Sequence, residues 1–270
     1  MRLNRSKIMD THKLLRIISK WSNTPETKIL SGACDVEDIG DGYVNNVWRI
    51  RSRENPDMSV VVKHAEPYLK FLGSDTPLTV DRINMEFCAL SKFDELHPGC
   101  VPKPLVLDDE NNLVIMEDLR DYKTMRKALV AGEFHMGAVK KIAETMAILH
   151  RKTHRKCVSE VQFEELLNRF QNDEMLSLLD RYLFTYPLLP YHKANQYSDE
   201  VKAQLPRIHG DQILQENASK IRARHIAMKQ CLVHGDFHTE AVMVKNDSIK
   251  GANEVGSREG NMLKLWFETY

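Results

Sequence analysis

The chain has 270 residues, and its 38 Lys and Arg balance its 38 Asp and Glu, so the formal net charge is zero. This balance gives no electrostatic reason to expect nucleic acid or an anionic membrane as a partner. No apolar run approaches the roughly 20 residues that a bilayer span needs. The five cysteines are scattered without a CxxC pair, which favours reduced thiols in a cytosolic protein over a disulfide framework or a zinc site.

The first part of the chain is predicted to be rich in β-structure. Residues 10–21 place apolar side chains at helical spacing after Asp10, a residue type that caps helices. Residues 27–53 consist of short β-like pieces that are broken by Gly40, Gly42 and a pair of asparagines. The next piece, DMSVVVKHA, is a β-branched strand that carries a lysine near its end. Two strands, a glycine turn and a third strand predict an antiparallel sheet.

A change from strands to helices follows further along the chain. Residues 79–96 predict a helix with Thr79 as a possible N-cap, and residues 101–119 predict two strands joined by the polar turn DDENN. Residues 138–149 carry apolar side chains on one helical face, and helical patterns continue to about residue 228. The sequence therefore predicts a β-rich first part and a helical second part, with the change near residues 119–123.

Two features of the β-rich part indicate a phosphate site when taken together. The turn in IGDGYVNNVWRI lets the backbone approach a ligand closely, although most such turns are plain hairpins. Lys63 lies in a buried strand, where its ammonium needs a partner such as a phosphate and a helix glutamate, and Glu86 lies in the next helix. Alone, such a lysine is better explained by an ammonium that extends to solvent. The order of glycine turn, strand lysine and helix glutamate favours the phosphate site.

The stretch LVHGDFHTEAVMV places His, Asp and Glu between apolar segments. Burying such groups without partners is costly, so we expect Asp236 on a tight loop between two short strands. A carboxylate there can orient a substrate hydroxyl and accept its proton. A second HGD, at residues 209–211, lies in a helical region without the following strand, and we interpret it as a loop.

The motifs GDGYVN, VVVKHA, PLTVDRINMEF, IMED and HGDFHTEAVMV resemble those of the methylthioribose kinases, within the aminoglycoside phosphotransferase and choline kinase group. The ordered match runs from Asp35 to Val244. The resemblance implies an α+β, two-lobed protein-kinase-like fold. Residues 1–119 would form an N-lobe with an antiparallel sheet and an N-terminal helix, and residues 120–247 a mostly helical, incomplete C-lobe with the catalytic loop. Residues 248–270 would form a divergent, poorly ordered tail.

The resemblance also implies an ATP site in the N-lobe. Lys63 would contact the phosphates, and Glu86 would hold Lys63 in place. The glycine loop over the phosphates would be formed by Asp41, Gly42 and Asn45. The hinge whose backbone reads adenine would be formed by Met116, Glu117, Asp118 and Leu119.

By the same resemblance, Asp236 is the catalytic carboxylate and binds the 1-hydroxyl of the sugar in line with the γ-phosphate. His234 and His238 would shape its loop. His150 and His154 have the spacing of metal ligands on a helix, but the family also has histidines there, so we expect a structural role.

The sequence departs from the family pattern at the metal site. No D-x-E motif, which holds Mg²⁺ in the family, follows Asp236, so the Mg²⁺ site is incomplete and we expect this chain by itself to be inactive. Glu240 stands where the family has a glycine, and Ala241 replaces a residue with a side-chain oxygen. Glu240 could help to bind Mg²⁺ or could repel ATP. We interpret the residues after 247 as a splice or gene-model end.

Three functions are therefore open. The first is phosphorylation of S-methyl-5-thioribose at its 1-hydroxyl in methionine salvage by a cytoplasmic kinase. The second is a non-catalytic, kinase-like module that binds a nucleotide or a partner. The third is a kinase for another small acceptor, such as choline or an aminoglycoside. The expected partner is a small sugar, with neither nucleic acid nor membrane, and only the family resemblance suggests a homodimer.

Overall fold

The computed structural model describes residues 9–40, 44–70, 74, 76–235, 237–245, 248–251 and 266–268. The chain divides into two compact units. The first contains Met1–Leu149 and Asp236–Leu265, and the second contains His150–Gly235 and Trp266–Tyr270. The first unit extends beyond residue 119, where the N-lobe is predicted to end. The two units do not test that boundary, and it stays a prediction. Within the described ranges, no helix combines the length and apolar character that crossing a membrane requires.

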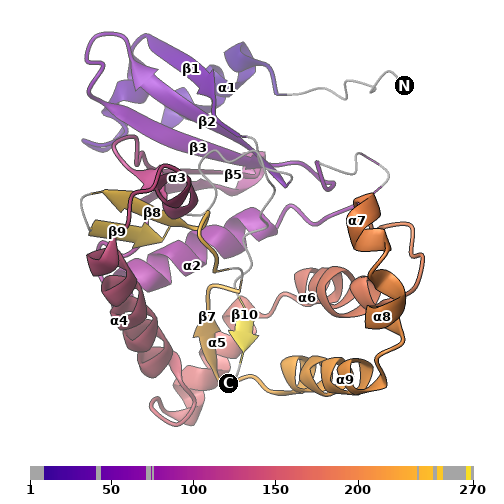
Figure 1. Cartoon of the computed structure of the whole chain (residues 1–270). Helices are drawn as coiled ribbons and strands as arrows, with labels where there is room; N and C mark the ends of the chain where they lie inside the picture. The colour runs from indigo at the N-terminus through magenta and orange to yellow at the C-terminus, as the bar shows by residue number, and fades with distance from the viewer. Residues whose placement is uncertain are drawn as a thin grey trace. The chain divides into compact units, whose positions relative to one another are not determined.

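A five-stranded antiparallel sheet forms the centre of the first unit (Figure 1). Its spatial order is β1-β2-β3-β5-β4. The strands are β1 (Cys34–Asp38), β2 (Asn45–Ser52), β3 (Ser59–Ala65), β4 (Pro104–Asp108) and β5 (Leu113–Glu117). In the central strand β3, Lys63 lies opposite Val47 of β2 and Val114 of β5. The predicted antiparallel sheet is confirmed, and its strand lysine lies in the middle of the sheet.

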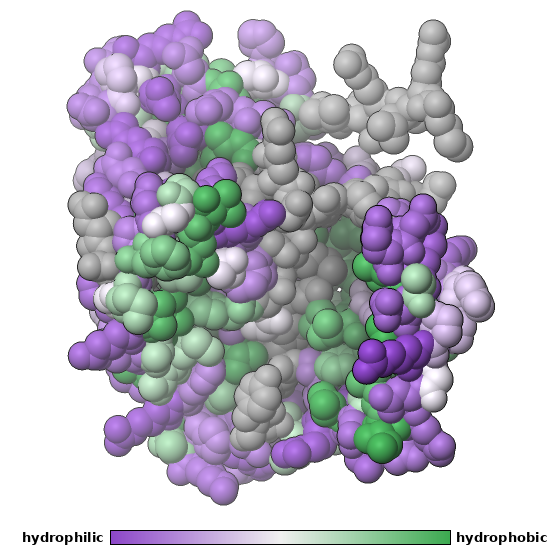
Figure 2. Space-filling model, in the orientation of Figure 1, coloured by the Kyte–Doolittle hydropathy of each residue, from purple (hydrophilic) through white to green (hydrophobic). Residues whose placement is uncertain are grey.

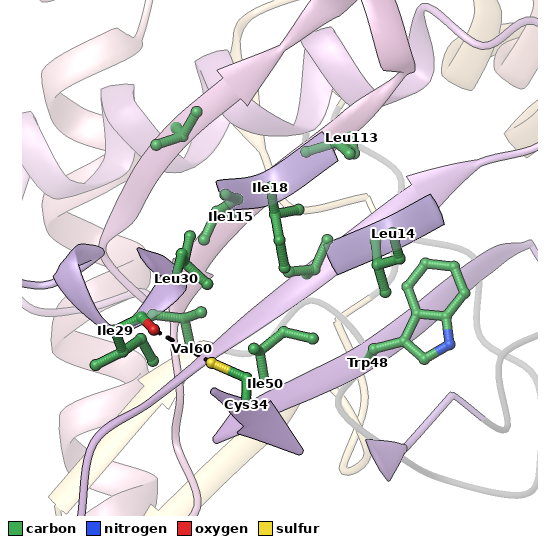
Figure 3. Packing of buried hydrophobic residues seen from close by; sticks show 12 residues of the cluster. Leu14, Ile18, Ile29, Leu30, Cys34, Trp48, Ile50, Val60, Leu113 and Ile115 are labelled. Carbon is green, nitrogen blue, oxygen red and sulfur yellow. Dashed lines mark hydrogen bonds between the residues drawn. The ribbon is translucent and has the colours of Figure 1, made fainter. Parts of the chain in front are cut away.

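One face of this sheet packs against α1 (Thr11–Ile18), as Figure 3 shows. Leu14 and Ile18 of α1 are fully buried, and they belong to one apolar cluster with Val60 and Val62 of β3. The helix begins where the sequence predicts, because the Asp10 carboxylate accepts a hydrogen bond from the His12 amide. The predicted N-terminal helix therefore completes the core on this side.

The opposite face of the sheet packs against α2 (Arg82–Leu96). Side chains alternate along a strand, so Lys63 points away from the α1 cluster that contains Val60 and Val62. The helix begins three residues later than its expected cap: Thr79 instead accepts a hydrogen bond from the Asp81 amide, 3.2 Å away. The N-cap prediction is therefore wrong, because Thr79 closes a turn before the helix.

The predicted hairpin over residues 101–119 is confirmed. Strands β4 and β5 are antiparallel, and a 3₁₀ turn, Asp109–Asn111, joins them at the DDENN segment. The buried Asp108 carboxylate accepts hydrogen bonds from Trp21 Nε1 and Asn111 Nδ2 and pairs with Lys20 Nζ at 2.9 Å. These contacts hold Lys20 and Trp21, which follow α1, against the hairpin of β4 and β5.

The rest of the first unit consists of a smaller sheet and two helices. The sheet has the order β6-β8-β9, with β6 (Lys123–Thr124), β8 (Val242–Lys245) and β9 (Ser248–Gly251). Helix α3 (Met125–Val130) and the first part of α4 (Met136–Thr153) share an apolar cluster with β8. Figure 2 shows apolar surface where α3 and α4 lie, and the exposed residues there include Val130, Phe134, Met136 and Val139.

The second unit is mostly helical, as the sequence predicts. Its helices are α5 (Glu160–Phe170), α6 (Asp173–Leu179), a π-helix (Asp180–Thr185), a 3₁₀ turn (Tyr186–Leu188), α7 (Asp199–Lys202), α8 (Leu205–His209) and α9 (Gln212–Ala227). Strand β7 (Cys231–Val233) pairs with β10 (Trp266–Glu268), so the predicted divergent tail contains two short strands, β9 and β10. The second HGD is a connection between helices, where Asp211 caps α9 by accepting from the Leu214 amide.

Candidate active site

A buried ion pair joins the sheet to α2. Lys63 Nζ lies 2.8 Å from Glu86 Oε1, and the two side chains are 1% and 4% exposed. Removing both charges from water costs several kcal/mol for each ion, so neither group is stable there without a charged or hydrogen-bonding partner. The predicted contact between Lys63 and Glu86 is therefore present. Their role toward a nucleotide stays a prediction.

The glycine segment brings β1 and β2 close together. Asp41 and Gly42 lie outside the described residues. At Gly40, a Cβ atom would lie 2.8 Å from the backbone N and 3.1 Å from Cβ of Val47, closer than real side chains allow. The neighbouring Ile39 amide donates to the Val47 carbonyl at 3.1 Å. The backbone at Gly40 therefore lies so close to Val47 of β2 that glycine is required there. This close approach is consistent with the predicted strand–turn–strand.

Asn45, which the resemblance assigns to the glycine loop, is the first residue of β2 and is buried. Its Oδ1 accepts a hydrogen bond from Arg82 Nε at 2.9 Å. Arg82 is itself buried and lies one helical turn before Glu86 in α2. Arg82 received no role from the sequence, although it is the arginine of the PLT-x-x-R motif. The motif could have indicated a role for Arg82, because its arginine precedes the helix glutamate by four residues.

The hinge segment, residues 116–119, begins with the last two residues of β5 and continues beyond the strand. Met116 and Leu119 are buried, with 0% and 2% of their surfaces exposed. The Glu117 amide donates to the Lys103 carbonyl at 2.9 Å, and the Glu117 carboxylate accepts from the Lys103 amide at 3.0 Å. Because the Glu117 N–H is used within the sheet, the predicted reading of adenine depends on the other backbone groups of the hinge.

Asp118 has a different environment from the rest of the hinge. Its carboxylate, 2% exposed, accepts from Arg49 Nε at 2.7 Å and from Ser59 Oγ at 2.6 Å. These bonds, together with a second one from Arg49 Nη2, tie the hinge to β2 and β3. The Asp118 side chain therefore holds the hinge against the sheet, and only its backbone is left for the predicted contact with adenine.

Asp236, the predicted catalytic carboxylate, lies outside the described residues. In the second unit, Gly235 before it has φ = 80°, a left-handed conformation that favours glycine. In the first unit, the residues after it form a tight turn. His238 Nδ1 accepts from the Glu240 amide at 3.1 Å, and the His238 carbonyl accepts from the Ala241 amide at 2.9 Å. His238 therefore shapes the turn, as the resemblance implies.

Glu240, which replaces a family glycine, is bound to α3. Its Oε1 pairs with Arg126 Nη1 at 3.2 Å, and the Arg126 amide donates to the Thr239 carbonyl at 3.1 Å. The other carboxylate oxygen, Oε2, is buried and has no hydrogen-bond partner among the described residues. The pair with Arg126 neutralises the charge that Glu240 brings to this loop.

The described residues do not provide a Mg²⁺ site. Within the ranges given above, no three or more His, Cys, Asp or Glu side chains gather closely enough to hold a metal. Mg²⁺ is bound in proteins by one or two carboxylates together with phosphates and water. Glu240 offers a single buried carboxylate, and one of its oxygens is occupied by Arg126. The donor set that is described therefore does not fit a complete metal centre.

His150 and His154 do not form a metal pair. His154 Nδ1 accepts from the Lys156 amide at 3.1 Å, so its Nε2 carries the proton and donates to Gln230 Oε1 at 3.1 Å. Burial lowers the pKa of His150, with a smaller contribution from His154. Both nitrogens of His154 serve hydrogen bonds within the second unit, which supports the expected structural role.

A cavity of about 570 Å³ lies beside the hinge but does not suit a nucleotide. Neither Lys63 nor Glu86 lines it. Its charged lining is mostly acidic, and phosphate groups would be repelled by those carboxylates. The charged residues that line it are Glu26, Asp57, Asp94, Lys103, Glu117 and Asp118. The only cation among them, Lys103, already pairs with Glu26 at 2.9 Å.

The chain is similar to curated methylthioribose kinases. It is 29% identical over 213 residues to that of Bacillus velezensis and 30% identical over 213 residues to that of Geobacillus kaustophilus. Each match covers 79% of this chain but only 54% and 53% of the relatives, so the chain spans about half the length of the curated relatives it matches. No protein-family model matches the chain.

Among solved structures, the ethanolamine kinase of Plasmodium vivax shares the fold. The TM-score is 0.51 at 13% sequence identity, and the match covers 90% of this chain and 61% of that chain. At this identity the likeness bears on the fold alone. The predicted α+β, protein-kinase-like fold is confirmed.

Proposed function

We propose that the chain is the nucleotide-binding and catalytic-loop part of an ATP-dependent kinase that phosphorylates S-methyl-5-thioribose at its 1-hydroxyl, in methionine salvage. The similarity to methylthioribose kinases over 213 residues supports the acceptor. The observation that carries the proposal is the Lys63–Glu86 pair, which fixes an ammonium group inside the sheet of a kinase-like fold. An ammonium held in this way is suited to neutralise a phosphate.

In the proposed reaction, the sugar 1-hydroxyl oxygen forms a bond to the γ-phosphorus of ATP. The bond from that phosphorus to the β,γ-bridging oxygen breaks, and ADP leaves with the electron pair. Asp236 orients the hydroxyl and accepts its proton. Lys63 neutralises charge on the phosphates, and Asn45 keeps the edge of the glycine segment beside them. Mg²⁺ has no complete ligand set among the described residues, so no step is assigned to it.

A second candidate function is nucleotide binding without transfer. It is favoured by the lack, within the described part of the chain, of any cluster of three or more His, Cys, Asp or Glu side chains that could hold a metal. Metal ions neutralise much of the charge in phosphoryl transfer, and losing ~5 kcal/mol of that stabilisation slows a reaction by roughly 10³- to 10⁴-fold. Choline and aminoglycoside acceptors are less well supported, because the curated relatives reported above are methylthioribose kinases.

A coupled assay for ADP formation distinguishes these functions. It is run on this chain and on a longer chain joined to a D-x-E segment, each with and without methylthioribose. Kinase function predicts that the longer chain forms ADP only when methylthioribose and Mg²⁺ are present, and that Asp236→Asn abolishes this turnover. Unchanged turnover in Asp236→Asn would remove the proposed base. Nucleotide binding without sugar-dependent ADP formation by either chain would select the second function.

A further inference from the structure

Among the residues that the structure describes, Arg82 bonds to three separate segments of the first unit. It is buried, with 7% of its surface exposed. Nε donates to Asn45 Oδ1, at the start of β2, and Nη2 donates to the Val44 carbonyl at 3.2 Å. Nη2 also donates to the Glu66 carbonyl at 2.8 Å, just after β3. Nη1 donates to the Thr79 carbonyl at 2.6 Å, in the turn before α2.

The positions of these acceptors give Arg82 its function in the fold. Val44 and Asn45 lie at the start of β2, directly after Gly42 and Tyr43 in the sequence, whereas Glu66 directly follows β3, the strand that carries Lys63. A guanidinium presents five N–H donors in a fixed planar fork, so one side chain can bond to several carbonyls in set directions. Arg82 therefore holds the start of β2, the end of β3 and the start of α2 in one arrangement.

The same helix carries the glutamate of the ion pair. Arg82 and Glu86 are four residues apart in α2, so they lie on the same side of the helix and both are buried. Any shift of α2 that breaks the contacts of Arg82 also moves Glu86 relative to Lys63. The start of β2 and the ion pair are thus linked through one turn of helix.

We infer that Arg82 is a positioning residue for phosphate binding, which couples Val44 and Asn45, at the start of β2, to the Lys63–Glu86 pair. This inference rests on the proposed nucleotide site, because it assigns the loop and the lysine to the phosphates of ATP. Arg82 acts through its neighbours and does not itself touch the nucleotide. Replacing it should weaken the binding of phosphates while leaving the binding of the adenine and ribose groups unchanged.

The test compares the binding of ATP and of adenosine. Both compounds compete with a fluorescent ATP analogue for the unchanged chain, for Arg82→Lys and for the control Asp108→Asn. Lysine keeps the positive charge, but its donors all lie on one nitrogen, so it cannot reproduce the planar fork with which the guanidinium reaches the three segments. Asp108→Asn weakens the same unit on the α1 side of the sheet, through Trp21 and Lys20, away from α2. Hydrogen exchange at residues 44–46 and 79–86 is measured in parallel.

We expect Arg82→Lys to lose at least tenfold in ATP affinity and less than twofold in adenosine affinity, with faster exchange in both segments. Asp108→Asn should leave the ratio of the two affinities unchanged. If Arg82→Lys does not fold, Asn45→Ala removes the Nε contact alone and should shift the ratio in the same direction by a smaller factor. Equal losses for ATP and adenosine, or no loss, overturn the inference. If the unchanged chain binds no ATP, the proposed function fails. Hydrogen exchange then still tests the coupling: an unchanged rate in Arg82→Lys at residues 44–46 and 79–86 overturns it as well.

Discussion

Breaking the Lys63–Glu86 pair from one side should destabilise the first unit strongly. At 2.8 Å the Coulombic attraction is about 6 kcal/mol for an effective dielectric constant of about 20, and it is opposed by desolvation of both ions. A variant such as Glu86→Leu removes the attraction but leaves the ammonium of Lys63 buried. We expect the free energy of unfolding to fall by about 3–5 kcal/mol, the range measured when one partner of a buried pair is removed.

Replacing both partners should cost much less. In Lys63→Met/Glu86→Leu neither charge of the pair is left in the core, and apolar side chains of similar volume fill the space. We expect this double variant to lie within about 1–2 kcal/mol of the unchanged chain, and so to be more stable than either single variant. Urea unfolding followed by tryptophan fluorescence is a suitable assay, since Trp21 and Trp48, two of the three tryptophans, belong to the first unit.

Two results would contradict a buried, charge-compensated pair of Lys63 and Glu86. If Glu86→Leu loses less than about 1 kcal/mol, the pair is not buried as the structure shows, because only exposed ion pairs are that weak. If the double variant loses as much as the two single variants together, the losses come from packing at each position and not from an uncompensated charge.

Two further predictions concern the same sheet. Gly40→Ala should lower stability by about 1–3 kcal/mol in thermal unfolding, because the new Cβ would lie 2.8 Å from the Val47 backbone N; unchanged stability would show that the strands can separate there. Burial, with smaller contributions from Arg82 and Lys13, lowers the pKa of His64 from 6.5 to about 4, so the unfolded chain binds a proton between these values and the folded chain does not. The stability due to neutral His64 is therefore complete above pH 6.5 and is lost as the pH falls toward 4, by up to roughly 3 kcal/mol. In urea unfolding, His64→Leu should lose less stability between pH 7 and pH 5 than the unchanged chain does, and an equal loss in both would contradict this prediction.

Local patterns predicted the first unit well because its elements carry strong signals. The β-branched run around Lys63, the DDENN turn and the apolar spacing after Asp10 each depend on neighbouring residues alone. The N-cap of α2 was missed because Thr79 has the same side-chain chemistry in a cap and in a turn. In the structure the Thr79 hydroxyl accepts from the Asp81 amide, and α2 begins at Arg82, whose guanidinium bonds to the distant carbonyls of Val44 and Glu66.

The site could be predicted only in part for the same reason. The contact between Lys63 and Glu86 follows from the order of strand and helix, and the family resemblance adds their roles. In contrast, the bonds of Asp118 to Arg49 and Ser59 join residues 59 to 69 positions apart, and no local pattern encodes them. The pairing of Glu240 with Arg126 spans 114 positions, which is why the sequence left the effect of that glutamate open.

Calorimetric titration of ATP into the unchanged chain and into Lys63→Met/Glu86→Leu is the most direct test of whether Lys63 binds the phosphates of ATP. The double variant is suited to this measurement because it should remain folded without the proposed phosphate ligand. We expect the unchanged chain to bind ATP and the double variant to bind it at least 100-fold more weakly. Equal affinity for ATP in two folded proteins would contradict the assignment of Lys63 to the phosphates.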